Sequence, residues 1–344
     1  MQAILTAYKP ALDAYVRDYL KARRAENTQV NKWHDDIYTR LEQFVLHGKS
    51  IRGCLFLWAL ETYQGVVHPT DYSLAASFEL IHSGFLIHDD IMDNDRDRRG
   101  NPTLYAQYER VATDTNKLSP DSFGKNLAIC AGDLAIFLGM DCLVSTPNIS
   151  PQHAAIAREY ASVCIAQMQD VAFGSDVSLP SVDEVLSLYT YKTARYTIML
   201  PLREGARIGS ADTNDIAALE EIGQHIGIVF QLTDDLLNLY GNPKNTGKPV
   251  GSDIREGKKT FAYITLLNSL TEREKQLITD THSSDEKLAR IMEYMRTYSI
   301  REKVEQYCVL LISECQKRIS QLHIPQKSKN DLSELITFVK ERTS

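Results

Sequence analysis

The chain has 344 residues, a formal net charge of −7 and 43% hydrophobic residues, a composition typical of a soluble globular protein with a substantial core. The negative balance gives no reason to expect nucleic acid or an anionic membrane as a partner. We find no apolar stretch long enough for a membrane span and no signal peptide, so we expect no stable membrane insertion and a cytoplasmic location. The six cysteines show no Cys-x-x-Cys spacing and are expected to be free thiols in helix cores.

Helical periodicity dominates the chain. Apolar residues recur at three- and four-residue spacing in residues 38–46, 54–63, 73–88, 126–145, 153–172, 182–208, 214–240, 260–270 and 299–322. Residues 105–125 contain many turn-forming residues and are expected to form a surface loop. We find no alternating strand pattern, internal repeat or linker. The sequence therefore predicts a single all-α domain spanning residues 1–344, built as a helical bundle.

The segment 88–103 joins five aspartates and three arginines to the end of an apolar helical run. Asp89 and Asp93 would lie one turn apart on the same helix face, where like charges repel. A hard divalent cation relieves this repulsion. Magnesium prefers oxygen ligands, and its coordination shell is usually completed by waters and substrate phosphates. Arg98 and Arg99 match phosphate geometry. The alternative is a solvated charged helix end.

A second segment repeats the pattern. Asp234 and Asp235 end another apolar helical stretch, with Asn238 one turn after Asp234 and Gln231 nearly one turn before it. A loop rich in glycine and lysine follows at residues 246–260, where glycines allow the chain to fold over a ligand and lysines bring charge to phosphates. Two acidic helix ends, each followed by a basic segment, predict a site for a magnesium-bound phosphate ester.

The order of these motifs resembles that of the trans-isoprenyl (polyprenyl) diphosphate synthase family. Residues 89–93, with Arg98-Arg99-Gly100, resemble the family's first aspartate-rich motif, and residues 231–238 resemble the second. Further similar segments are Gly48-Lys49-Ser50-Ile51-Arg52, Glu79-Leu80-Ile81-His82, Ala131-Gly132-Asp133, Lys192-Thr193 and the loop from Gly247-Lys248 to Gly257-Lys258. In three departures, Gly53 replaces a usual proline, Asn238 replaces an aspartate, and residues 105–125 are longer than in the shortest members of the family.

The resemblance implies an isoprenoid-synthase-like bundle with a deep central cavity, at whose mouth the two aspartate motifs face each other. It implies head-to-tail transfer of a dimethylallyl, geranyl or farnesyl group from its diphosphate to isopentenyl diphosphate. The cofactor would be Mg²⁺, for which Mn²⁺ can substitute, and the protein would be a homodimer built through long helices.

The resemblance also implies roles for individual residues. The metal would be held by Asp89, Asp90, Asp93, Asp234, Asp235 and Asn238. The allylic diphosphate would contact Arg98, Lys192, Thr193, Gln231, Lys248 and Lys258, of which Arg98, Lys192, Gln231 and Lys258 would assist departure of the diphosphate. Isopentenyl diphosphate would be bound without metal by Lys49, Arg52, His82 and Arg99.

Product length is expected to depend on the residues four and five positions before Asp89. Phe85 would point into the channel one helical turn deeper, and Gly84 would leave its own site open. In the family, aromatic residues at these positions resemble a floor that stops elongation. One aromatic residue and one glycine favour geranylgeranyl diphosphate as the product, with farnesyl diphosphate next.

Two other classes share parts of this pattern. A class I terpene cyclase of the same fold usually carries Asn-Asp-x-x-Ser-x-x-x-Glu as its second metal motif. The segment Asn330-Asp331-Leu332-Ser333-Glu334 begins in the same way, but its serine comes one residue too early for a match. A cyclase also has no use for Lys49, Arg52 and His82. A non-catalytic subunit of a heteromeric prenyl synthase typically loses aspartates, whereas both doublets are intact here. The sequence favours an active enzyme.

Overall fold

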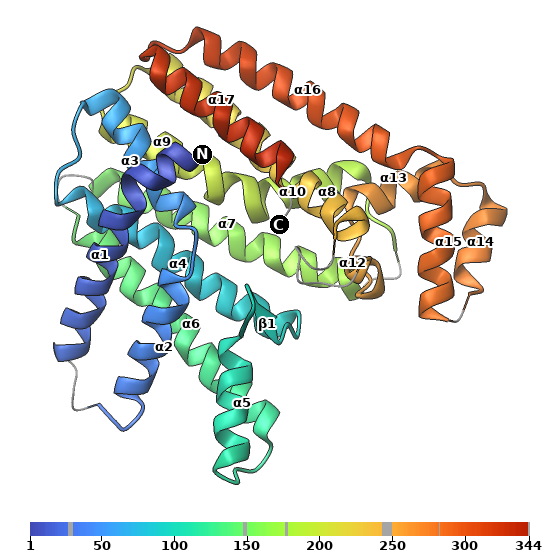
Figure 1. Cartoon of the computed structure of the whole chain (residues 1–344), viewed down its shortest axis with the longest axis horizontal. Coiled ribbons are helices and arrows are strands. Elements are labelled where there is room, and N and C mark those ends of the chain that lie inside the picture. Colours follow the sequence, from blue (N-terminus) through green and yellow to red (C-terminus); the bar gives the residue numbers. More distant parts are fainter. Residues whose placement is uncertain (27–29, 147–149, 176–177, 243–249, 282, 343–344) are drawn as a thin grey trace. The chain divides into compact units, whose positions relative to one another are not determined.

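A computed structural model describes the chain except for residues 27–29, 147–149, 176–177, 243–249, 282 and 343–344. Helices make up almost all of the described secondary structure, so the prediction of an all-α fold is confirmed (Figure 1). Two compact units are present, which we call the N-terminal unit (residues 2–155 and 204–211) and the C-terminal unit (residues 1, 156–203 and 212–344). That they act as one domain stays a prediction.

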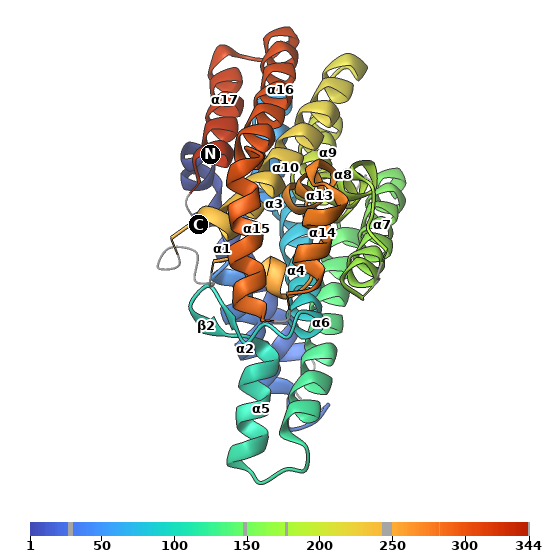
Figure 2. The same cartoon turned by 90° about the vertical axis from the view of Figure 1, so that its right-hand side faces the viewer.

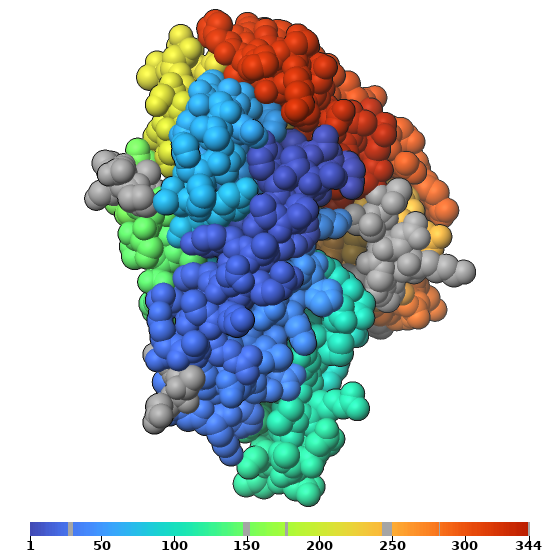
Figure 3. Space-filling model, turned by 60° about the vertical axis from the view of Figure 1, so that its left-hand side comes forward, coloured from blue at the N-terminus to red at the C-terminus, as the bar shows by residue number. Residues whose placement is uncertain are grey.

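The N-terminal unit is a group of helices around α4. Its helices are α1 (Gln2–Glu26), α2 (His34–Leu46), α3 (Ile51–Gln64), α4 (Asp71–Met92), α5 (Leu104–Asp114), α6 (Pro120–Val144), the start of α7 (Ser150–Ser175) and the end of α9 (Leu200–Ile208). Helix α4 packs along α6 and against α3, and α5 runs beside α6 (Figures 1 and 2). Helix α1 contacts α2, α3 and α4 and forms the dark blue surface in Figure 3.

Small residues allow α4 and α6 to approach closely. A Cβ atom added to Gly139 would lie 2.6 Å from Ile81 Cγ1, and one added to Gly132 would lie 2.3 Å from His88 Nε2. Both distances are shorter than van der Waals contact, so a larger residue would push the helices apart. The glycine in Ala131-Gly132-Asp133 therefore has a packing role: it leaves room for the His88 ring.

A short hairpin follows α4 and was not expected from the sequence. Strands β1 (Asp97–Arg98) and β2 (Asn101–Pro102) pair antiparallel. The two residues between them, Arg99 and Gly100, have φ values of 54° and 76°, as a two-residue type I′ turn requires. The hairpin fixes the backbone on which Arg98 and Arg99 are carried.

The C-terminal unit is arranged around α10. Its elements are the rest of α7, α8 (Val182–Tyr189), the π-helix η1 (Thr190–Met199), the start of α9, α10 (Thr213–Tyr240), α12 (Ser252–Arg255), α13 (Phe261–Ser269), α14 (Glu272–Thr279), α15 (Ser284–Thr297), α16 (Ile300–Gln321) and α17 (Gln326–Glu341). Helix α10 packs against η1, α16 and α17. Close contact with η1 depends on Gly227, where an added Cβ would lie 2.3 Å from Ala194 Cα.

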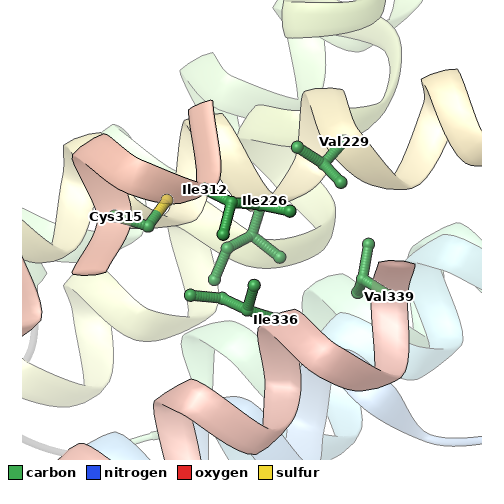
Figure 4. Close-up of a pocket in the computed structure, with 6 residues that line it drawn as sticks. All are labelled: Ile226, Val229, Ile312, Cys315, Ile336 and Val339. Carbon is green, nitrogen blue, oxygen red and sulfur yellow. The ribbon is translucent and has the colours of Figure 1, made fainter. Parts of the chain in front are cut away.

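The contact between α10, α16 and α17 is apolar. Six side chains line a small gap there, which has no room for a water molecule (Figure 4). These are Ile226, Val229, Ile312, Cys315, Ile336 and Val339. The stretch with the cyclase-like opening, residues 330–334, lies within α17, where Leu332 is fully buried.

The expectations about residues 105–125 and about the cysteines need correction, and helix α1 was not expected. The loop expected at residues 105–125 is wrong, because this segment contains most of α5 and the start of α6. Helix α5 is amphipathic and buries Leu104, Tyr105, Tyr108 and Ala112, whereas most of the turn-forming residues of this segment come after its end at Asp114. Helix α1 buries few residues and was missed. The cysteines are all free, but Cys130 and Cys164 are exposed and not in cores.

Helix α6 also corrects the expectation about apolar stretches. It is long and apolar enough to cross a membrane by length and composition, with a mean hydropathy of 2.0 in its best window, and 44% of that window is buried inside the protein. The buried part includes Ala128, Ala131 and Ala135. A core helix of a globular protein has this same character.

Candidate active site

The first aspartate motif lies at the carboxyl end of α4. Asp89 is in the last turn of the helix and Asp93 is its C-cap, with the amide of Asp93 donating to the Asp89 carbonyl at 2.9 Å. Both side chains are half-buried. A helix carboxyl end is the negative end of its dipole, so two carboxylates placed there attract a cation.

Asp90 is held differently from its neighbours. It is 1% exposed, and its Oδ1 accepts from Arg98 Nε and pairs with Nη2, each at 2.6 Å. Its Oδ2 is buried and meets no hydrogen-bond donor within the described part of the chain. Burial raises the pKa of Asp90 to about 6, and the neighbouring Asp89 and Asp95 add to the effect, while Arg98 opposes it.

Arg52, His82 and Arg99, which are predicted to bind isopentenyl diphosphate, come together in the N-terminal unit. Arg52 lies in the first turn of α3 and is 7% exposed, three residues after the exposed Lys49. Arg99 Nη1 lies 3.4 Å from the position of a Cβ added to Gly48, so the hairpin arginine reaches the segment before α3. The pKa of Arg99 is lowered by burial and by the positive charges of Arg98 and Arg52. Such a concentration of cations favours an anion.

His82 belongs to the same cluster. Its pKa lies well below the usual value, first because of burial and then because Arg52, Arg99 and Arg98 repel a further positive charge. The imidazole is therefore neutral at physiological pH and can donate one hydrogen bond without adding charge.

In the C-terminal unit, Asp234 lies on the exposed side of α10. Its Oδ1 pairs with Arg342 Nη2 at 3.1 Å, and the Arg342 guanidinium stacks on the Phe230 ring at 4.1 Å. Phe230 and Asp234 are one helical turn apart, so Arg342 covers both from the C-cap of α17. Sequence reasoning missed Arg342, because nothing near it in the chain resembles a motif.

Asp235 is the buried member of the second doublet. It is 3% exposed; its Oδ1 accepts from Gln231 at 3.2 Å and its Oδ2 accepts a short hydrogen bond from the Tyr189 hydroxyl. That hydroxyl accepts from the Phe261 amide at 2.9 Å, and Thr193 donates to Gln231 at 3.2 Å. Burial raises the pKa of Asp235 well above its usual value, and Tyr189 lowers it only in part. Asp235 thus connects α8, α10 and α13.

The remaining predicted residues of this unit have defined partners. Lys192, in η1, donates a short hydrogen bond to Asp170 on α7. Asn238 accepts from the Asp253 amide at 3.2 Å and donates to Ser252 Oγ at 2.6 Å, so its amide joins α10 to the start of α12. Lys258 Nζ lies 3.2 Å from Glu256 and 4.0 Å from Asp253. Lys248 lies outside the described residues.

The expectation that Gly84 leaves an open site is wrong. A Cβ added there would lie 2.7 Å from the Gly132 carbonyl oxygen and 2.6 Å from Ile136 Cγ1, both on α6. Gly84 is therefore part of the close packing between α4 and α6. Phe85 is half-buried on α4, one turn before Asp89 as expected.

The residues present fit a magnesium site. The carboxylate oxygens of Asp89 and Asp93 at the end of α4 are hard donors of the kind that Mg²⁺ prefers, and Oδ2 of the neighbouring Asp90 meets no hydrogen-bond donor in the described part of the chain. In the C-terminal unit, Asp234 already pairs with a cation, Arg342. The partners that sequence reasoning missed are Tyr189, Asp170, Asp253 and Arg342, each far in sequence from the residue it contacts, apart from Asp253.

The chain is similar to known proteins over most of its length. The model of the polyprenyl synthetase family matches residues 34–297. A short chain isoprenyl diphosphate synthase of Methanothermobacter thermautotrophicus is 31% identical, with 86% of each chain covered. A geranylgeranyl diphosphate synthase of Sulfolobus acidocaldarius is 30% identical, covering 85% of this chain and 87% of the relative.

A solved structure is similar over nearly the whole chain. It is the geranylgeranyl pyrophosphate synthase of Corynebacterium glutamicum complexed with isoprenyl diphosphate and magnesium, with a TM-score of 0.87, 31% identity and coverage of 97% of this chain and 98% of that chain. With the family match over residues 34–297, these similarities show that the chain belongs to the polyprenyl synthetase family and is a prenyltransferase of the isoprenyl diphosphate synthase type.

Proposed function

We propose that the protein joins an allylic diphosphate head-to-tail to isopentenyl diphosphate and releases pyrophosphate. The observation that carries this proposal is the cluster of Arg52, His82 and Arg99, in which two guanidinium groups lie near a neutral imidazole. Such a cluster provides for a second diphosphate that binds without metal, which chain elongation needs and cyclisation does not.

The reaction needs no protein nucleophile. The C1–O bond of the allylic diphosphate breaks, the isopentenyl double bond forms a new C–C bond to that carbon, and a proton leaves the resulting cation for the released pyrophosphate. Mg²⁺, when bound, neutralises charge that develops on the leaving diphosphate. Asp89, Asp93 and Asp234 would hold it; Arg98, Lys192 and Lys258 would add positive charge to the diphosphate.

The direct test is chromatography of products from labelled isopentenyl diphosphate with dimethylallyl, geranyl and farnesyl diphosphate in turn. Chain elongation with at least one starter is expected. Asp89→Ala and Asp234→Ala should each lower turnover by orders of magnitude, whereas Asp18→Ala, on the exposed side of α1, should not. Near-normal turnover of Asp89→Ala in saturating magnesium would exclude the proposed site.

We also propose a medium product length. Phe85 is the aromatic residue one turn before Asp89, and geranylgeranyl diphosphate is the favoured product, with farnesyl diphosphate next. Phe85→Ala should shift products to longer chains. Gly84→Phe no longer tests this idea, because it would force α4 and α6 apart and is expected to destabilise the protein. An unchanged product distribution in Phe85→Ala would place the floor elsewhere.

We further propose a homodimer. Helix α6 exposes Ile129, Phe137 and Val144, at 43%, 72% and 58%, along one side of the helix. A stripe of large exposed apolar residues on a regular helix is a surface that another protein covers, and a second copy of the chain is the partner expected in this family.

A further inference from the structure

The start of α3 is held by a buried carboxylate from another helix. Glu79, on α4, is 5% exposed, and its Oε1 accepts from the Gly53 amide at 2.8 Å. The N-cap residue of α3, Ser50, makes no side-chain hydrogen bond to the helix. The first amides of a helix need acceptors from elsewhere, and a carboxylate there also meets the positive end of the helix dipole. Glu79 therefore acts as the cap of α3 from outside its own sequence.

Glu79 also lies close to two of the clustered arginines. Burial raises the pKa of Glu79, and Arg52, the amides of Gly53 and Arg52, and Arg99 all act to lower it again. These two arginines flank a site that we assign to isopentenyl diphosphate. A carboxylate near Arg52 and Arg99 reduces the repulsion between these two arginines.

Gly53 makes this contact available. A Cβ added to Gly53 would lie 2.5 Å from Leu12 Cδ2 and 2.8 Å from the Ala75 carbonyl oxygen, so a side chain here would hold α3 away from α4. Glycine also keeps an amide hydrogen that a proline in this position would lack. The departure of Gly53 from the family pattern thus coincides with a hydrogen bond to Glu79.

We propose that Glu79 is a positioning residue for the isopentenyl diphosphate site, which fixes the first turn of α3 and, with it, the guanidinium of Arg52 beside that of Arg99. This inference rests on the proposed function. Glu79 acts through Arg52 and Arg99, because its carboxylate is bonded to the Gly53 amide and would repel a diphosphate.

The test is Glu79→Gln, which keeps an oxygen for the Gly53 amide and removes the charge. The Michaelis constant for isopentenyl diphosphate is expected to rise about tenfold, with the constant for the allylic substrate and kcat changed less than about twofold. Calorimetric titration with isopentenyl diphosphate in EDTA should show the same loss of affinity without metal. The matched control is Glu159→Gln, a buried glutamate held by Arg195 and Arg203 in the C-terminal unit, which should change stability without this selectivity.

Equal changes in both Michaelis constants, or none in that for isopentenyl diphosphate, would overturn the inference. If Glu79→Gln does not fold, Glu79→Asp takes its place. This variant keeps the charge on a shorter side chain and should raise the Michaelis constant for isopentenyl diphosphate about threefold. Arg52→Gln distinguishes failure of this inference from failure of the proposed substrate site. If Arg52→Gln raises the constant and the Glu79 variants do not, this inference alone fails; if Arg52→Gln has no effect, the proposed site itself is wrong.

Discussion

Within each aspartate doublet, the two carboxylates have different surroundings. Asp89 and Asp234 are accessible, whereas Asp90 and Asp235 are buried and bonded to Arg98 and Tyr189. An accessible carboxylate can exchange its neighbours for a metal ion, while a buried one stabilises the fold through the bonds it accepts. In each doublet we therefore expect the accessible carboxylate to bind metal and the buried carboxylate to stabilise the fold.

This division predicts different effects of four substitutions. Asp89→Asn and Asp234→Asn should raise the magnesium concentration for half-maximal activity at least tenfold and change thermal stability little. Asp90→Asn and Asp235→Asn should lower the free energy of unfolding by about 1–3 kcal/mol, because each disturbs a buried hydrogen bond. The two effects are measured by magnesium titrations of activity and by denaturant unfolding of the metal-free proteins. A loss of stability in the Asp89 and Asp234 variants, with altered magnesium dependence only in the Asp90 and Asp235 variants, would contradict the prediction.

The lowered pKa of His82 predicts a pH dependence of stability. In the unfolded chain the imidazole takes up a proton near pH 6.5, but in the folded protein burial and three arginines oppose protonation. Above the pKa of the unfolded chain, both states are neutral at His82 and the stability of the protein is at its full value. As the pH falls below that pKa, the unfolded chain takes up the proton first, so the free energy of unfolding decreases by up to about 1.4 kcal/mol per pH unit. Denaturant unfolding between pH 5 and pH 8 should show a steeper acid loss in the wild type than in His82→Gln. Parallel profiles would indicate a solvated His82.

At the level of helices, the end of α17 lies against the face of α10 that carries Asp234. Arg342 pairs with Asp234 and stacks on Phe230, so a protein cation occupies the neighbourhood that magnesium would need. The guanidinium and the metal ion then compete for the same carboxylate. Arg342→Gln should therefore lower the Mn²⁺ concentration for half-saturation, measured by electron paramagnetic resonance on the protein without substrate, about threefold or more.

Arg301→Gln is the control for Arg342. Arg301 is also an arginine of the C-terminal unit that stacks on an aromatic ring, that of Tyr240, and it pairs with an exposed glutamate. It should leave Mn²⁺ binding unchanged. Weaker Mn²⁺ binding in Arg342→Gln would show that Arg342 supports the metal and does not compete with it.

Helices with wide apolar faces and the aspartate motifs were predictable from the sequence, because both signals are local. The helix of residues 214–240 was expected and α10 spans Thr213–Tyr240. Partners from distant segments were not predictable: Tyr189 reaches Asp235 across 46 residues, and Arg342 reaches Asp234 only because α17 packs on α10. The same holds for Gly84, whose lack of space is set by α6 and not by its own helix.

For the whole molecule, the exposed stripe of α6 predicts the oligomeric state. The stripe combines Ile129, Phe137 and Val144 on a helix whose other side packs against α4 and α5, so burying it needs a further chain. Sedimentation equilibrium should give twice the mass of the chain for the wild type.

Phe137→Glu places a charge in the centre of the stripe and should weaken the dimer at least a hundredfold, because an unpaired buried charge opposes association. Leu310→Glu, at an equally exposed apolar residue of α16, is the control and should remain dimeric. A monomeric wild type, or a Phe137→Glu protein as dimeric as the control, would contradict the assignment of this stripe to a second copy.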